Sequence, residues 1–252
     1  MRADACVSTR VFASGLTRVT DHDVRVTEEA PSFTPDLFSF LRELAANNDR
    51  EWFATNKERY VAQVQEPALA FIEDVGMRMP DISRHIVADP RTTGGSLFRI
   101  YRDTRFAKDK TPYKTHCGIQ FRHARTRDVH APGFYLHLEP GSVFMACGVW
   151  HPERDTLHAI RTAIAAKPKR WTEITDGLDG FRLGGESLKR PPAGFDRDHP
   201  LIEELKRKDF MAITDMSEKD ALASGFLDEF IGRCEAADDF MRFLCDATRV
   251  AY

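Results

Sequence analysis

The sequence has little net charge, no long apolar run and no paired-cysteine motif. Its 36 Lys and Arg residues are nearly balanced by 39 Asp and Glu residues, so the formal net charge is only −3. No overall field of one sign therefore attracts nucleic acid or a membrane surface. The chain has no run of about 18 apolar residues and no N-terminal apolar stretch of the kind that signal peptides need. We expect a cytoplasmic protein without a membrane-spanning segment.

The five cysteines are scattered, and none belongs to a CxxC pair. They are Cys6, Cys117, Cys147, Cys234 and Cys245. An odd number of unpaired cysteines indicates reduced thiols and disfavours a disulfide framework or a zinc knuckle. The sequence also has no GxSxG, P-loop or GxGxxG motif, so nothing in it indicates a serine hydrolase, a kinase or a dinucleotide-binding protein.

The composition supports a packed core, because 42% of the 252 residues are hydrophobic and 30% are charged. Residues 1–32 show no sustained periodicity, and we expect them to form a poorly ordered N-terminal extension. Residues 33–252 are long enough for a single domain.

Helical patterns fill the first third of this domain. Thr34 is placed to cap a helix that starts at Pro35, and a second helix is expected after Asp49. Pro67 interrupts that second helix or opens a third, which Pro80 is expected to end.

Strand patterns follow, and helices return after them. Strands are predicted over Leu97–Tyr101, Thr115–Phe121, Phe134–Leu138 and Val143–Val149, the last two joined by a Pro-Gly turn. A helix is expected from Pro152, a loop-rich stretch from Gly180 to Gly194, a short strand near Phe210 and one long helix over Phe226–Leu244. We therefore predict an α+β fold with N-terminal helices, a central mainly antiparallel sheet and C-terminal helices.

The segment from Arg99 to His116 carries most of the residues that suggest function. Between Arg99 and Lys114, six basic residues face two acidic ones, a local balance of +4 in an otherwise slightly acidic chain. These basic residues are candidates for binding an anionic substrate, since Arg suits bidentate contacts with carboxylate or phosphate and Lys supplies a point charge. They are Arg99, Arg102, Arg105, Lys108, Lys110 and Lys114.

Two other interpretations of this segment stay open. Neighbouring pairs such as Arg102 with Asp103 and Lys108 with Asp109 could simply brace a loop. A basic face from Arg99 to Arg127 could contact nucleic acid or another protein, although nucleic acid is disfavoured because no nucleic-acid-binding motif accompanies the charge.

Three residues in or near this segment are candidates for catalysis. His116, His137 and Tyr113 combine acid or base groups with the basic residues around them. Glu139 lies two residues after His137 on a predicted strand, so both side chains project from the same face and could line the site. Together with His116, His151 and Glu153, these two residues could form a His and carboxylate metal site. No HExxH motif or compact ligand pair is present, however, and we predict no metal ligand.

Several longer motifs resemble one family. They are NNDREWF from Asn47, RIYRDTRFAKDKTPYKTH from Arg99, PGFYLHLEPG from Pro132, GVWHPE from Gly148 and GESLKRPP from Gly185. Together they resemble the domain of unknown function 2461 family over about Phe33 to Phe210, with Ala107 where many relatives would carry a serine. The resemblance implies a single domain and a site in these motifs, and it carries over no reaction, cofactor or catalytic residue.

The sequence thus favours an enzyme or ligand-binding protein that recognises a small carboxylated or phosphorylated molecule through the Arg99 to His116 segment. The alternative is an interaction module that uses the basic face from Arg99 to Arg127. The reaction, the cofactor and the oligomeric state are left open by the sequence.

Overall fold

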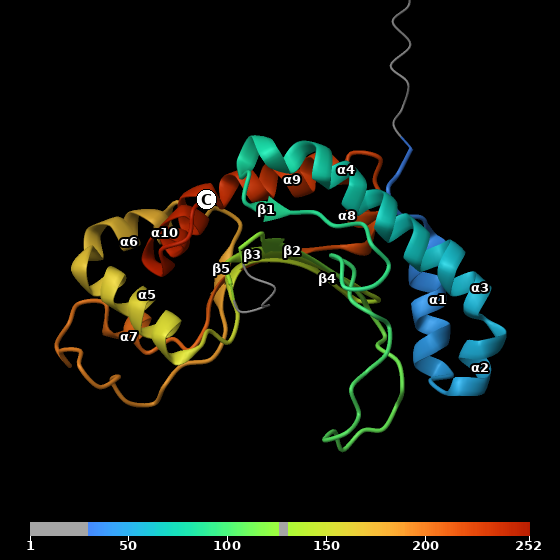
Figure 1. Ribbon diagram of the computed structural model, residues 1–252, viewed down its shortest axis with the longest axis horizontal. Coiled ribbons are helices and arrows are strands. Elements are labelled where there is room, and N and C mark those ends of the chain that lie inside the picture. Colours follow the sequence, from blue (N-terminus) through green and yellow to red (C-terminus); the bar gives the residue numbers. More distant parts are fainter. Residues whose placement is uncertain (1–29, 126–130) are drawn as a thin grey trace, which may run out of the picture.

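A curved antiparallel sheet carries the fold, with helices packed over one of its faces (Figure 1). This computed structural model describes residues 30–125 and 131–252. The N-terminal extension up to residue 29, Cys6 and Arg127 lie outside the described residues. Among the residues that are described, no helix has the length and apolar character needed to cross a membrane.

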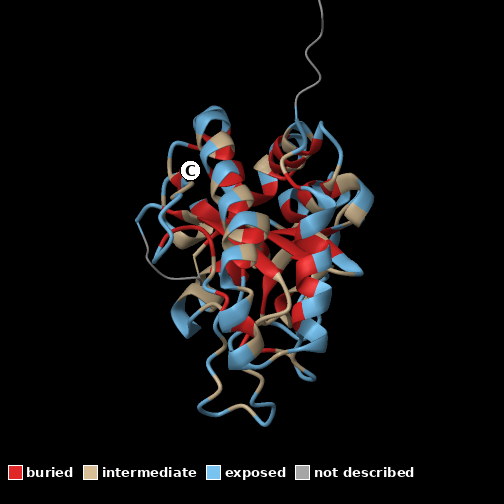
Figure 2. Cartoon of the chain, turned by 90° about the vertical axis from the view of Figure 1, so that its right-hand side faces the viewer, coloured by how far each residue is buried: buried red, intermediate tan, exposed pale blue. Residues whose placement is uncertain are grey.

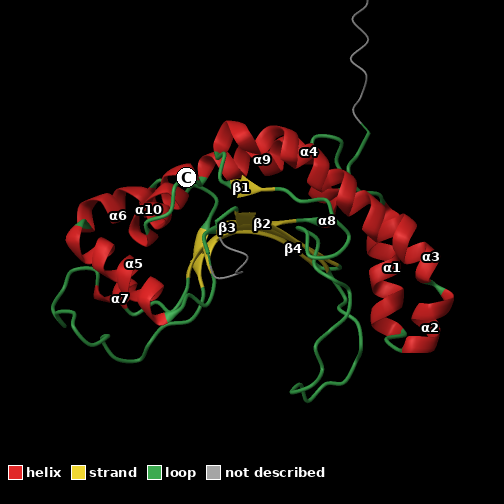
Figure 3. Cartoon of the chain, viewed as in Figure 1, coloured by secondary structure: helices red, strands yellow, loops and turns green. Residues whose placement is uncertain are grey.

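Along the chain, the described helices lie before the first strand or after the fourth, and Figure 3 distinguishes helices from strands by colour. They are α1 (Pro35–Ala46), α2 (Arg50–Thr55), α3 (Lys57–Tyr60), the π-helical turn η1 (Val61–Gln65), α4 (Glu66–Ile82), α5 (Arg154–Ala166), α6 (Pro168–Asp176), α7 (Ile202–Leu205), α8 (Glu218–Ala221), α9 (Phe226–Ala236) and α10 (Asp238–Thr248). The strands are β1 (Ile86–Val87), β2 (Cys117–His123), β3 (Gly133–Glu139), β4 (Ser142–Val149), β5 (Arg182–Gly184) and β6 (Phe210–Met216).

The six strands pair in the order β1-β2-β3-β4-β6-β5, and every neighbouring pair is antiparallel. Side chains alternate between the two faces of each strand. One face carries a continuous apolar surface under the helices, and its centre is formed by Ile119, Phe121, Phe134, Leu136 and Met145, all 0% exposed. Within the described chain, no helix covers the opposite, concave face (Figure 1).

Aromatic contacts fasten the helices to the covered face. Phe121 of β2 and Phe71 of α4 each place their ring centroid 5.5 Å from that of Phe230 in α9. Further along the strand order, Trp171 of α6 packs edge-on against Phe210 of β6, with their ring centroids 5.9 Å apart. Figure 2 shows the buried residues on the inward sides of these helices and on the sheet. The predicted α+β class, with helices at both ends of the chain and a central antiparallel sheet, is confirmed.

The C-terminal helix predicted over Phe226–Leu244 is wrong in one respect, because the structure has two helices that meet at Ala237. The break lets each half reach a different neighbour. Phe226 and Phe230 of α9 pack on Phe71, whereas Phe240 of α10 packs on Trp171, 5.8 Å away. One straight helix over a curved sheet could not serve both contacts.

The predicted strand over Leu97–Tyr101 is also wrong, since only isolated bridges form there, Leu97 with Ile119 and Tyr101 with Tyr113. Leu97 and Ile100 are both buried. A spacing of three residues between buried positions does not fit the two-residue alternation of a regular strand.

Two smaller expectations need correction. Pro80 does not end its helix, because α4 continues to Ile82, which is buried, and the loss of one backbone hydrogen bond in the last turn is tolerated. The Thr34 side chain makes no cap hydrogen bond to α1, although Pro35 does open the helix. Asp49, by contrast, caps α2 as expected, accepting a hydrogen bond from the Trp52 backbone N–H at 2.8 Å.

Candidate functional site

Side chains from four strands meet on the concave face of the sheet because the strand register aligns them. Two rows run across β2, β3, β4 and β6. In the order of these strands, the first row consists of Gly118, His137, Phe144 and Asp215. The second row consists of Gln120, Tyr135, Ala146 and Ile213.

A cavity of about 350 Å³ lies over these rows. Its walls are mostly apolar and aromatic, and they include Phe98, Gln120, Tyr135, Phe144, Ala146, Trp150 and Ile213. Phe98 immediately precedes the Arg99 to His116 segment, called the basic loop below, and its backbone N–H donates to the Gly118 carbonyl oxygen at 2.9 Å, which holds it over β2. A volume of this size, enclosed by rings and supplied with a few polar groups, is typical of small-molecule sites.

Gln120 is the polar group of this cavity whose bonding is incomplete. The side chain is only 9% exposed, and its Oε1 is buried with no hydrogen-bond partner among the described residues. A buried acceptor without a partner costs about 1–3 kcal/mol. A bound molecule with a donor group would remove that cost.

A hydrogen-bond chain runs along β3 beside the cavity. Tyr135 Oη lies 2.9 Å from His137 Nδ1, and His137 Nε2 lies 3.1 Å from Glu139 Oε2. Thr115 Oγ1 donates to the other carboxylate oxygen, Glu139 Oε1, at 2.7 Å. Burial raises the pKa of Glu139, but the hydrogen bonds from Thr115 and His137 outweigh it, and the net pKa is lowered.

The direction of this chain follows from the charge of Glu139. An ionised carboxylate only accepts hydrogen bonds, so Nε2 of a neutral His137 carries the proton and Nδ1 accepts from the Tyr135 hydroxyl. Burial raises the pKa of Tyr135, which keeps that hydroxyl protonated. The arrangement can hold His137 in one orientation and can pass a proton between the cavity and Glu139.

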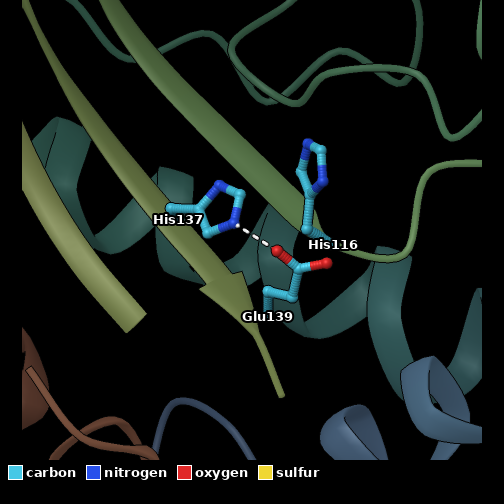
Figure 4. A group of neighbouring side chains, drawn as sticks. All are labelled: His116, His137 and Glu139. Carbon is cyan, nitrogen blue, oxygen red and sulfur yellow. Dashed lines mark hydrogen bonds and ion pairs between the residues drawn. The ribbon is translucent and has the colours of Figure 1, made fainter. Parts of the chain in front are cut away.

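His116 completes a group with His137 and Glu139 (Figure 4). The centroids of the two imidazole rings are 4.4 Å apart, and the potential ligand atoms of all three residues lie within 4.8 Å of one another. Burial first, and the nearby His137 second, lower the pKa of His116 to about 4, so its ring is neutral at physiological pH. Sequence analysis named these three residues, and the structure brings them together.

Two arginines of the basic loop form ion pairs with acidic residues of the same loop. Arg102 pairs with Asp109 and Thr111, and the Arg105 guanidinium pairs with Asp103 at 2.6 Å. Arg–Asp pairs therefore do brace the loop, which is one of the two interpretations left open by the sequence, but they join other residues than the adjacent pairs Arg102 with Asp103 and Lys108 with Asp109. Neighbours in an extended segment point to opposite faces. Both acidic side chains instead bond across a turn.

The remaining basic candidates divide by position. Lys110 Nζ donates to the Thr104 carbonyl oxygen at 2.8 Å, and Arg99 and Lys108 are exposed. Lys114 contacts a residue that lines the cavity: its Nζ lies 5.1 Å from the Phe98 ring centroid and donates to the Arg99 carbonyl oxygen at 2.9 Å. Burial, and then the charge of Arg99, lower the pKa of Lys114.

Tyr113 and His151 lie in other surroundings. Tyr113 is 5% exposed and stacks on Phe53 in the hydrophobic core, with ring centroids 4.1 Å apart. His151 packs against the buried Asp209, which accepts hydrogen bonds from the backbone N–H groups of His151 and Glu186 at 2.7 and 3.0 Å. That carboxylate joins two loops.

Sequence reasoning missed the residues that form the cavity itself. Tyr135 could have been found, because it precedes His137 by two positions on the same strand and must share its face. Gln120 and Phe144 could not, since their place beside His137 depends on which strands pair and in which register.

The fold and these side chains define an α+β protein with a candidate small-molecule site on the concave face of its sheet. Residues 36–243 match the family described as conserved hypothetical protein (DUF2461), and the chain belongs to that family. The match confirms the resemblance carried by the sequence motifs. No curated protein matches the chain.

Proposed function

We propose that this protein binds a small molecule with an apolar, ring-shaped body and an anionic group in the concave-face cavity. The observation that carries the proposal is a mostly aromatic cavity of about 350 Å³ whose lining includes Gln120, a side chain with a buried, unpartnered Oε1. A purely structural cavity would be expected to be apolar throughout or to satisfy its polar atoms internally.

The aromatic walls favour a flat ligand. The Phe98 and Tyr135 centroids are 5.9 Å apart, and those of Tyr135 and Phe144 are 6.0 Å apart. Phe144 is itself held by stacking on His137 at 4.6 Å and an interplanar angle of 15°. Rings held in this way lose little conformational entropy when a ligand binds. Less of the free energy gained by burying apolar surface is then offset by the cost of ordering side chains.

Lys114 is the cation best placed for the ligand's anionic group. Arg102 and Arg105 already form ion pairs with acidic residues of their own loop. Their positive charges are therefore less available to a ligand than the local balance of +4 suggests. Lys114 lies beside the Phe98 wall and is half-buried, where an ion pair is screened less than at the surface. The same pairing of Arg102 and Arg105 weakens the alternative of a nucleic-acid-binding face.

Calorimetric titration with 2-naphthoate and its uncharged analogue 2-naphthamide tests this proposal, with a chelator present throughout. The carboxylate should bind more tightly than the amide. Lys114→Met should remove that difference, which corresponds to about a tenfold or greater loss for naphthoate. Lys108→Met, a change in the exposed part of the same loop, should leave both affinities unchanged.

Two cavity variants complete the design. Ala146→Phe places a ring in the cavity over the concave face and should abolish binding of both compounds while the circular dichroism spectrum stays native. Gln120→Leu keeps a similar side-chain size and removes the unpaired oxygen, so it should raise the melting temperature. It should also weaken the binding of naphthamide, because the N–H₂ group of this compound is the donor that the oxygen would accept from. The proposal is wrong if folded Ala146→Phe binds both compounds like the parent protein, or if the parent binds neither at millimolar concentration.

A further inference from the structure

Three potential metal ligands converge beside the cavity because of the register of two strands. His137 and Glu139 are two residues apart on β3 and share a face. Cys117 of β2 pairs with Leu138 of β3, so the residue before Cys117 and the residue after Leu138 come side by side. These two residues are His116 and Glu139, and Figure 4 shows all three side chains gathered at this point.

The separations of the three side chains suit a metal ion. Ligand atoms bound to one ion at about 2.0–2.2 Å lie about 3.0–3.5 Å from each other. His137 Nε2 and Glu139 Oε2 are already 3.1 Å apart, and the whole group lies within 4.8 Å. His116 would complete the set by a shift of about 1 Å, which a rotation of its side chain supplies.

His116 is the member whose role the protein's own contacts do not explain. Within the described part of the chain its ring contacts His137, but neither of its nitrogens has a hydrogen-bond partner there. A neutral imidazole keeps a lone pair that is free to bind a metal. The other two members have partners that would orient them as ligands.

Those partners form the outer contacts that metal sites require. Thr115 Oγ1 holds the far oxygen of Glu139 at 2.7 Å, and Tyr135 Oη contacts Nδ1 of His137 at 2.9 Å. With an ion on Nε2, the ring proton would sit on Nδ1, and this N–H would donate a hydrogen bond to the Tyr135 hydroxyl oxygen. A metal-bound histidine commonly donates its second N–H in this way.

We propose that His116, His137 and Glu139 bind a divalent first-row transition metal ion at the edge of the concave-face cavity. Two imidazole nitrogens and one carboxylate oxygen suit Zn²⁺, Co²⁺, Fe²⁺ or Mn²⁺ better than Mg²⁺ or Ca²⁺, which prefer oxygen ligands alone. Three protein ligands leave coordination positions for water or for the anionic group of a bound molecule.

Titration of chelator-treated protein with Co²⁺, followed by visible absorption and calorimetry, tests the site. We expect one Co²⁺ per chain, with d–d absorption bands that Zn²⁺ abolishes by displacement. His116→Ala and Glu139→Gln should each lower the Co²⁺ affinity by about 100-fold or more, and Tyr135→Phe by about 10-fold or more. His158→Ala removes an exposed histidine of α5 and should change nothing.

The proposal is overturned if the parent protein shows no d–d bands at millimolar Co²⁺, or if His116→Ala binds Co²⁺ as tightly as His158→Ala. His116→Gln, which is closer in size, replaces the alanine variant if the latter loses its native circular dichroism. The result is independent of the proposed small-molecule function, since this titration contains no organic ligand and the naphthoate titration contains a chelator.

Discussion

A Cβ atom at Gly118 would lie 2.7 Å from Oη of Tyr135, closer than real Cβ contacts allow. The absence of a side chain at Gly118 therefore leaves room for the Tyr135 hydroxyl in the position from which it contacts His137. The same Cβ would stand 3.2 Å from Cδ2 of Phe98. One glycine thus fixes both an aromatic wall of the cavity and the hydroxyl that orients His137.

Gly118→Ala should destabilise the protein by about 1–3 kcal/mol, because the added methyl group overpacks a site that rigid rings surround. It should also weaken Co²⁺ binding by displacing the Tyr135 hydroxyl. Chemical denaturation and the Co²⁺ titration measure the two effects.

Gly232→Ala is the matched control for that change. Gly232 lies in the exposed interior of α9, and nothing stands within 4 Å of its added Cβ. The substitution should stabilise the protein by about 0.5–1 kcal/mol, since alanine favours the helix. Equal effects of the two substitutions would contradict the crowding at Gly118.

The acidic residues of the basic loop should titrate at unusually low pH. Side-chain hydrogen bonds from Arg102 lower the pKa of Asp109 to about 2, and those from Arg105 do the same for Asp103. Both folded values lie below the ordinary 3.8. These contacts therefore stabilise the loop above about pH 4 and are lost as the pH falls towards 2.

Carboxyl-carbon NMR titration checks this assignment, and each arginine controls for the other. Arg102→Met should move the midpoint of Asp109 up towards 3.8 and leave Asp103 low. Arg105→Met should do the reverse. If Arg102→Met moved the midpoint of Asp103 instead, Arg102 would pair with its neighbour Asp103 and not with Asp109.

The buried cysteines should be unreactive in the folded protein. Burial raises the pKa of Cys117, Cys147 and Cys245 to about 12 and that of Cys234 well above its ordinary value. A Cys6→Ser variant limits the measurement to these four. We expect no reaction with a disulfide reagent at mildly alkaline pH and four reactive thiols after denaturation, because the thiolate is the attacking species. Rapid modification of the native variant would show that one of them is accessible.

Tyr113 should matter for stability and not for binding. Its ring stacks on Phe53 in the core. Tyr113→Phe keeps the ring and should leave naphthoate and Co²⁺ binding unchanged, whereas Tyr113→Ala should cost about 3–5 kcal/mol of folding free energy. A loss of binding in the folded phenylalanine variant would restore Tyr113 as a candidate site residue.

Much of the fold could be predicted because its signals are local. Asp49 caps a helix, the Pro140-Gly141 turn joins β3 to β4, and period-two alternation marks β2 and β3. The predictions that failed depended on distant contacts. Ala237 looks like any residue of a long helix until the positions of Phe71 and Trp171 require the chain to bend there.

The candidate site, too, has features that follow from local sequence and features that depend on the folded structure. Residue types and the two-residue repeat of a strand determined by themselves that His137 and Glu139 share a face, and the basic composition of the Arg99 to His116 segment marked where to look. Only the tertiary structure decided that Arg102 and Arg105 are occupied by their own loop, that His116 meets Glu139, and that Gln120 lacks a partner beneath Phe98. The conformation of the loop itself controls the first of these outcomes. Strand register and burial control the other two, because both depend on side chains that are far apart in the sequence and meet only when the sheet has formed.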